Sequence, residues 1–81
     1  MERDTIINTI QEIVRDVIDN DEIVLNEKMT AADIEGWTSL SQAQILSAIE
    51  QKLGIRFSLK EIIEMKSIGQ IVEAIKSKIS E

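Results

Sequence analysis

The residues best suited to chemistry lie in one short stretch, GWTSL at residues 36–40, which holds the only tryptophan of the chain. Ser39 directly precedes a run with helical apolar spacing, so it is predicted to lie at the exposed start of a helix. Its oxygen can cap that helix, and Ser39 with Gln42 matches the capping-box pattern. Its hydroxyl can instead serve as a point of covalent attachment.

The composition excludes most enzymes that would use this serine. The chain has no histidine, cysteine or tyrosine, which removes Ser–His and Cys–His nucleophilic catalysis and any thiolate metal site. A carboxylate enzyme would need two acids that converge in a pocket, and the spacing shows no such pair. We therefore expect a protein that is not an enzyme.

The charge of the chain is negative and uneven. Of the net charge of −6, residues 1–38 contribute ten acids against three bases, and residues 39–81 contribute five acids against six bases. This distribution argues against binding to nucleic acid or to anionic membranes. The acidic run at residues 19–22 fails as a calcium loop because Ile23 and Val24 stand where a ligand and a glycine are required. No metal site is predicted.

One domain over residues 1–81 is expected, because no proline, repeat or low-complexity tract divides the chain. No apolar run reaches transmembrane length and the first residues do not resemble a signal peptide, so a cytoplasmic monomer is the default expectation.

The apolar spacing predicts an all-α fold, a four-helix bundle with a short third helix and a long first loop. The helices are expected at about 4–18, 39–53, 58–65 and 67–79, and the connection 19–38 is expected to pack across the domain, with a short turn of helix. Ser58 with Glu61 and Ser67 with Gln70 form two more capping boxes, and Gly54 supplies a left-handed stop. The residues expected to face the core are Ile6, Ile7, Ile10, Val14, Val17, Ile18, Ile23, Val24, Leu25, Met29, Ile34, Leu40, Ala43, Leu46, Ile49, Leu53, Ile68, Ile71, Val72, Ile75 and Ile79.

The motif in this setting resembles the acyl carrier protein family, which includes the peptidyl carrier domains. The resemblance rests on GWTSL, on the following Ile45-Leu46, Ala48-Ile49-Glu50 and Leu53-Gly54-Ile55, and on the helix order, and it covers essentially the whole chain. It implies that Ser39 accepts 4′-phosphopantetheine from coenzyme A through a phosphopantetheinyl transferase. Acyl groups would then be held as thioesters on the thiol of that arm. The expected partners are enzymes that load these acyl groups and enzymes that transfer them. A helix start suits the phosphate because its N–H groups and dipole favour an anion.

Two departures from the family pattern leave alternatives open. Thr38 stands where the family usually has aspartate, so modification is expected to be slower, to need a dedicated transferase, or to be lost. The exposed positions of the second helix are mostly neutral, which predicts weaker electrostatic steering than the family average. We therefore expect a specialised lipid, polyketide or related pathway rather than common fatty acid synthesis. The alternatives are a peptidyl or aminoacyl carrier, and a helical adaptor that no longer carries.

Further site residues follow from the resemblance. Gly36, Trp37, Thr38 and Leu40 flank the serine and are candidates for partner contact, although Trp37 can equally anchor the long loop. The positions that line an acyl cleft between the second and third helices in the family correspond to Ile49, Ile62, Met65 and Ile68. Each of these can instead be ordinary core. Because Ile62 is bulky, the cleft is expected to be small or collapsed without cargo.

Overall fold

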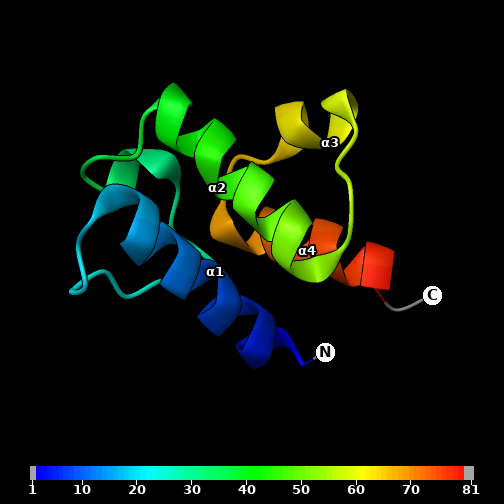
Figure 1. Ribbon diagram of the computed structural model, residues 1–81, viewed down its shortest axis with the longest axis horizontal. Helices are drawn as coiled ribbons and strands as arrows, with labels where there is room; N and C mark the ends of the chain where they lie inside the picture. Colours follow the sequence, from blue (N-terminus) through cyan, green and yellow to red (C-terminus); the bar gives the residue numbers. More distant parts are fainter. Residues whose placement is uncertain (1, 80–81) are drawn as a thin grey trace.

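The computed structural model describes residues 2–79 and is helical, with no strand in that range. Four α-helices and one 3₁₀ turn follow one another along the chain (Figure 1): α1 (Arg3–Ile18), η1 (Ala31–Asp33), α2 (Ser39–Leu53), α3 (Leu59–Glu64) and α4 (Ile68–Ile79). The helix α1 packs against α2 and α4, whereas α3 makes few contacts with the other helices. The predicted four-helix bundle with a short third helix and a long first loop is confirmed.

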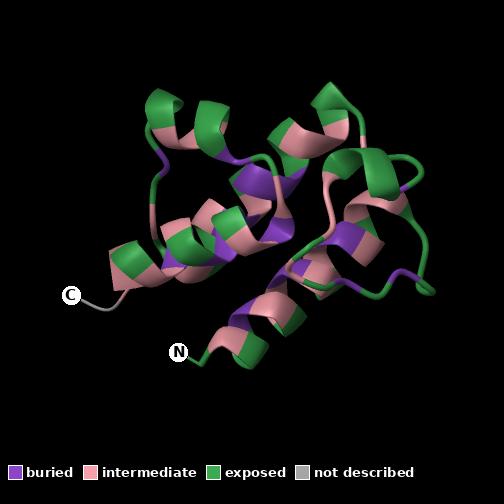
Figure 2. Ribbon diagram, turned by 180° about the vertical axis from the view of Figure 1, so that it is seen from behind, coloured by how far each residue is buried: buried purple, intermediate pink, exposed green. Residues whose placement is uncertain are grey.

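The core is aliphatic and lies between α1, α2 and α4, where the buried segments of the helices face one another (Figure 2). The side chains of Ile6, Ile10, Val14, Ile45, Ile49, Val72 and Ile75 have no exposed surface. Most of them follow the three- and four-residue spacing that a helix needs to present one apolar face. The predicted core positions of the first and last helices are confirmed, with Ile7, Val17, Ile18 and Ile79 at its partly buried margin.

The long connection is ordered by side chains of α1 and by the start of α4. Arg15 Nε donates to the Ile23 carbonyl at 2.8 Å, and Gln11 Oε1 accepts the Leu25 N–H at 2.9 Å. Further on, the Ile68 N–H donates to the Met29 carbonyl at 2.9 Å. The expected short turn of helix is present as η1, whose Asp33 carboxylate accepts the Thr30 N–H at 2.9 Å. The connection thus packs across the domain as predicted.

Arg3 joins three distant parts of the chain. Its guanidinium pairs with Glu27 of the long connection and with Glu73 of α4. The hydrogen bond from Arg3 holds the pKa of the Glu27 carboxyl below its usual value. In addition, the Gly69 N–H donates to the Glu27 carbonyl at 3.0 Å, an approach that leaves no free space for a side chain at Gly69. The beginning of α1, the middle of the connection and the first turns of α4 therefore form one hydrogen-bonded unit.

The predicted core face of α2 is partly wrong. Leu40 is 70% exposed and Ala43 is also exposed, whereas Ile45, which was not predicted, is fully buried. Leu40 and Ile49 are nine residues apart, which is two and a half helical turns, so they lie on opposite sides of the helix. Apolar residues occupy two faces of α2, and packing against α1 selects the face of Ile45, Leu46 and Ile49. Val24, also expected to be buried, is 68% exposed between the buried Ile23 and Leu25.

The helix ends largely follow the predicted caps. Gly54 is left-handed with φ of 66°, and its N–H donates to the Glu50 carbonyl. At α3, Ser58 Oγ accepts the Glu61 N–H at 3.2 Å while the Glu61 carboxylate accepts the Ser58 N–H at 2.7 Å, so this capping box is confirmed. At α4, Ser67 Oγ accepts the Gln70 N–H at 3.3 Å, but the Gln70 side chain turns to the Lys66 N–H instead.

Candidate functional site

The start of α2 is capped by Thr38, and the expected capping box of Ser39 with Gln42 is wrong. Thr38 Oγ1 accepts the Ser41 N–H at 3.2 Å, and Ser39 is the first helical residue. Threonine and serine are both good N-caps, so the sequence alone placed the cap one residue too late. Because Thr38 does the capping, the Ser39 hydroxyl is exposed and has no hydrogen-bond partner within residues 2–79.

The loop that precedes Ser39 packs against the end of α1 at Gly36. The backbone of Gly36 has φ of 90°, and a Cβ added there would lie 2.8 Å from Ile18 Cγ2. Only glycine fits that combination of a positive φ and a close approach. The Gly36 carbonyl in turn accepts a hydrogen bond from Ser41 Oγ at 2.8 Å. The backbone on both sides of Ser39 is therefore held while its hydroxyl stays free.

The electrostatic setting of Ser39 suits a phosphate group. Ser39 opens a helix of 15 residues whose first turn contains no acidic side chain. The first N–H groups of a helix lack partners within the helix, and together with the helix dipole they attract an anion. An exposed, unbonded hydroxyl at this end, without a carboxylate to repel a phosphate, fits a serine-linked phosphodiester.

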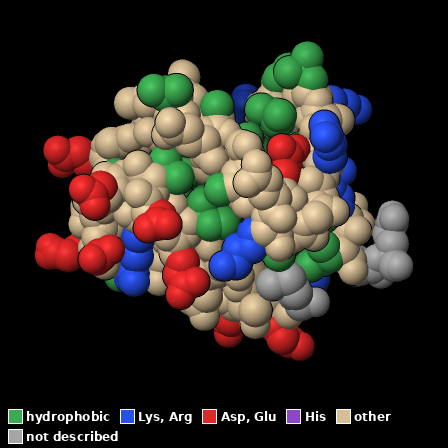
Figure 3. All heavy atoms as spheres, in the orientation of Figure 1, with side chains coloured by type: hydrophobic (Ala, Val, Ile, Leu, Met, Phe, Trp, Pro, Cys, Tyr) green, Lys and Arg blue, Asp and Glu red, His purple; other side chains and the backbone are tan. Residues whose placement is uncertain are grey.

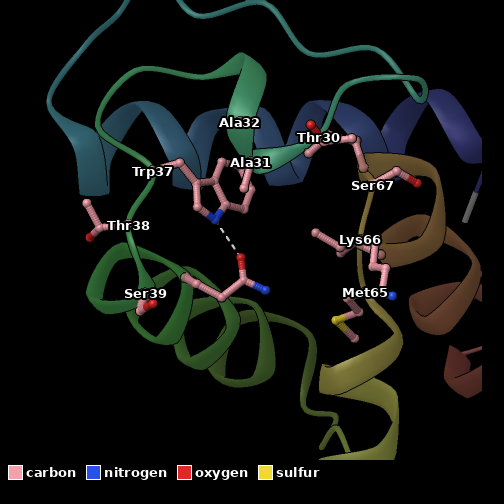
Figure 4. Close-up of a pocket in the computed structure, with 12 residues that line it drawn as sticks. Thr30, Ala31, Ala32, Trp37, Thr38, Ser39, Met65, Lys66 and Ser67 are labelled. Carbon is pink, nitrogen blue, oxygen red and sulfur yellow. Dashed lines mark hydrogen bonds between the residues drawn. The ribbon is translucent and has the colours of Figure 1, made fainter.

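A cavity of about 520 Å³ opens beside Ser39, between η1, the first turn of α2 and the segment that joins α3 to α4. Figure 4 shows the Trp37 ring entering it beneath η1, with Met65 and Lys66 on the opposite side. The lining residues are Thr30, Ala31, Ala32, Trp37, Thr38, Ser39, Gln42, Met65, Lys66, Ser67, Ile68 and Ile71. A group attached to Ser39 thus has a partly apolar hollow within reach.

Trp37 is half-buried and packs against the core, as expected of a residue that anchors the long loop. Its indole Nε1–H donates to Gln42 Oε1, which joins the loop to the second turn of α2 (dashed line in Figure 4). The same ring also lines the cavity. Both roles considered for Trp37, an anchor and a contact surface, are therefore compatible with its position.

The residues expected in an acyl cleft separate into two groups. Met65 and Ile68 line the cavity beside Ser39. Ile49 has no exposed surface, and Ile62 is half-buried at the edge of the core; neither lines this cavity. Gln42 and Lys66 were not anticipated as lining residues. The position of Gln42 one turn after Ser39 was a usable signal, whereas the contribution of η1 depends on how the long connection folds.

The first turn of α2 carries no acidic residue, and large apolar side chains are exposed on α2 and α3. Acidic side chains gather at one end of the face seen in Figure 3, and apolar side chains gather along its upper edge. Leu40 on α2 and Leu59 and Ile63 on α3 are 70, 73 and 65% exposed. Between residues 2 and 79, no three acidic side chains are placed to hold a metal ion. No helix in the same range has the length and apolar character needed to cross a membrane.

Comparisons with known proteins agree with this geometry. Residues 8–75 match the family model described as the phosphopantetheine attachment site. The structure is similar to the solution NMR structure of the holo acyl carrier protein from Geobacter metallireducens, with a TM-score of 0.85 and 31% sequence identity, covering 91% of this chain and 85% of that one. A comparison with curated protein sequences gave no match. The chain belongs to the acyl carrier protein family, whose members are not enzymes themselves but carry substrates on a covalent 4′-phosphopantetheine arm.

Proposed function

We propose that Ser39 is the attachment site of the 4′-phosphopantetheine arm and that the chain carries acyl groups on it as thioesters. The observation that carries this proposal is the free, exposed Ser39 hydroxyl at the first position of α2, beside a cavity that can shelter what it bears. When bound, the arm supplies the thiol that this cysteine-free chain lacks. The protein then presents a tethered substrate at high local concentration to enzymes that act on it.

In the attachment reaction this chain supplies the nucleophile, the Ser39 hydroxyl. Ser39 Oγ attacks the phosphorus next to the pantetheine portion of coenzyme A, and adenosine 3′,5′-bisphosphate leaves. The hydroxyl proton passes to a base on the phosphopantetheinyl transferase, because this chain has no histidine to accept it. The N–H groups at the start of α2 that Thr38 does not cap would stabilise the charge of a phosphodiester on Ser39. Thr38 and Gly36 hold the backbone so that the hydroxyl stays accessible.

The exposed surface of α2, which partner enzymes would contact, is the basis for proposing a type of pathway. The outward positions of α2 are mostly neutral, with Gln44, Ser47 and Gln51 exposed and no acid in the first turn. Partners that recognise carriers through basic patches would gain little from this helix. We therefore favour a carrier in a specialised lipid, polyketide or related pathway. A cytoplasmic monomer is part of the same proposal.

The test is the intact mass of the protein before and after incubation with coenzyme A, magnesium and a promiscuous phosphopantetheinyl transferase. We expect a gain of one phosphopantetheine, which Ser39→Ala abolishes. Ser47→Ala, a matched change at an exposed serine of the same helix, should be modified like the wild type. Modification of Ser39→Ala would contradict the site assignment.

A second candidate function is supported by the exposed apolar side chains of Leu40, Leu59 and Ile63. These suit a helical adaptor that binds proteins without carrying a group, and Thr38 in place of the family aspartate is consistent with it. A folded protein that gains no mass with several transferases would favour the adaptor. A gain of mass would favour the carrier.

A further inference from the structure

The long connection contains a segment, residues 22–26, in which buried and exposed residues alternate (Figure 2). Ile23 and Leu25 belong to the core, whereas Val24 between them is 68% exposed. This alternation is the pattern of an extended chain with one face buried. We infer that the segment is a docking edge, to which an extended segment of a partner protein pairs as an added antiparallel strand.

One side of the segment is satisfied by α1. The Ile23 carbonyl accepts a hydrogen bond from Arg15 Nε at 2.8 Å, and the Leu25 N–H donates to Gln11 Oε1 at 2.9 Å. In an extended chain, the N–H and C=O groups of alternate residues point to the same side, and those of the residue between them point to the opposite side. Because the bonding groups of Ile23 and Leu25 are directed at α1, the N–H and C=O of Val24 point away from it.

The opposite side of the segment is unpaired. Within residues 2–79, the Val24 N–H, the Val24 C=O and the Glu22 C=O form no hydrogen bond. In an antiparallel pair, two facing residues exchange both of their backbone hydrogen bonds, and the next such pair lies two residues further along. A partner residue opposite Val24 would therefore form two bonds, and the partner residue opposite Glu22 would form a third. The Glu22 N–H is not available, because Asn20 Oδ1 accepts it at 3.0 Å, so the docking edge is short.

The charge of the connection determines which partner fits this edge. Residues 19–28 hold four acids and one base, and one of the acids, Glu27, is already paired with Arg3. A second copy of this chain would place an equally acidic segment against the edge, and like charges on facing strands are destabilising. A partner strand with an apolar residue opposite Val24 and a basic residue opposite Glu22 is complementary. In the antiparallel register this is an apolar residue followed two positions later by lysine or arginine.

The docking edge is separate from the site at Ser39. The hollow beside the edge is lined by residues 4, 7, 8, 11 and 24–28, and none of these lines the cavity beside Ser39. Strand addition draws affinity from main-chain hydrogen bonds and specificity from alternate side chains, so it needs no group attached to the serine. A partner can thus stay bound to the connection while Ser39 is modified.

The experiment titrates the full chain, labelled with ¹⁵N, with the acetylated and amidated heptapeptide Thr-Thr-Val-Thr-Lys-Thr-Thr. Its valine and lysine occupy the positions expected opposite Val24 and Glu22. We expect a saturable shift of the Val24 amide resonance and slower hydrogen exchange of that amide. Methylation of the peptide valine nitrogen, whose N–H faces Val24, should weaken binding about tenfold. Methylation of the preceding threonine nitrogen, whose N–H points to solvent, is the matched control and should not.

Variants of the chain separate the edge from the general charge of the protein. Glu22→Gln should weaken binding of the peptide about two- to fivefold, whereas Glu64→Gln, which removes an equal charge from α3, should leave it unchanged. Ser39→Ala should bind the peptide like the wild type.

Three results would overturn the inference: no response of the Val24 amide, the same effect of methylation at both peptide positions, or equal binding of a peptide with glutamate in place of lysine. Shifts of the Val24 amide that depend on the concentration of the protein alone would identify a second copy as the occupant and overturn it too. None of these results bears on the gain of mass at Ser39, which tests the carrier function separately.

Discussion

Thr38 caps the helix that Ser39 begins, because its side-chain oxygen accepts the Ser41 N–H at 3.2 Å. The two neighbouring hydroxyls therefore have different tasks. Thr38 stabilises the helix, and Ser39 is left without an intramolecular partner in the described part of the chain. A modification at Ser39 thus does not disturb a bond on which the fold depends.

This separation predicts that Ser39→Ala leaves stability within about 0.5 kcal/mol of the wild type, because the change removes no hydrogen bond. Thr38→Ala should cost about 1 kcal/mol through the lost cap. Urea unfolding followed by circular dichroism measures both. If Ser39→Ala were the more costly change, the cap would belong to Ser39 after all.

Thr38→Asp is expected to keep the cap and to speed modification at Ser39. Aspartate is an equal or better N-cap than threonine. Its negative charge also interacts favourably with the helix dipole, which stabilises the helix by about 0.3–1 kcal/mol. The resemblance to the acyl carrier family adds the expectation that the acid assists a general-purpose transferase. Initial rates of mass gain for Thr38→Asp and Thr38→Asn compare charge at equal size. A rate for Thr38→Asp equal to that of the wild type would show that Thr38 does not slow modification.

The orientation of α2 predicts opposite results for two of its leucines. Leu40→Ala should change stability by less than about 0.5 kcal/mol, since the side chain is 70% exposed. Leu46→Ala should cost roughly 2–4 kcal/mol, since that side chain is buried. Denaturant midpoints of the two variants make the comparison. A large loss in Leu40→Ala would mean that α2 is rotated relative to the structure described above.

Two glycines with positive φ should differ in their tolerance of a side chain. Gly54→Ala meets nothing within 4 Å and should cost only the left-handed backbone penalty of about 1 kcal/mol. Gly36→Ala carries that penalty and also places its Cβ 2.8 Å from Ile18 Cγ2, so it should cost about 2–4 kcal/mol. Thermal unfolding of the pair gives the difference. Equal losses would argue against the close packing of the Ser39 loop on α1.

Glu61 should contribute to the acid sensitivity of the fold. Its hydrogen bond from the Ser58 N–H, followed by the ion pair with Lys78, lowers the pKa of its carboxyl. A lowered folded-state pKa gives stability that is complete above the unfolded-state value of about 4.3 and is lost as the pH falls through the folded-state value. Glu61→Gln should therefore flatten the loss of stability on the acid side. Glu64→Gln, which removes an equal charge from the same helix, is the control for unfolding scans across that range.

Much of the fold was accessible from the sequence because its signals are local. The capping box of Ser58 with Glu61, the glycine stop at Gly54 and the apolar stripes of α1 and α4 depend on residues within a few positions of each other. The face of α2 was not accessible in this way. Leu40 and Ile49 are both apolar, and only packing against α1 decides which side is buried.

The candidate site combines local and distant information. The position of Ser39 at a helix start follows from nearby residues, but the choice between Ser39 and Thr38 as cap depends on loop geometry that Gly36 imposes against Ile18. The cavity brings η1 next to the segment that joins α3 to α4, more than 30 residues later in the chain. The apolar spacing of the sequence cannot predict this contact between distant segments. Met65 and Ile68 were therefore expected near the site only through the family resemblance.

The hydrogen-bonded unit around Arg3 includes α1 and α4 but not α3. It fastens α1, the long connection and α4 to one another. In contrast, α3 has no buried side chain and is held by Ile62 at the edge of the core and by the ion pair between Glu61 and Lys78. We therefore expect a bound group to displace α3 more readily than it distorts the packing of α1 and α4. Enzymes that act on the protein one after another would then meet an unchanged surface around α1 and α4. The surface at α3 would differ with the bound group.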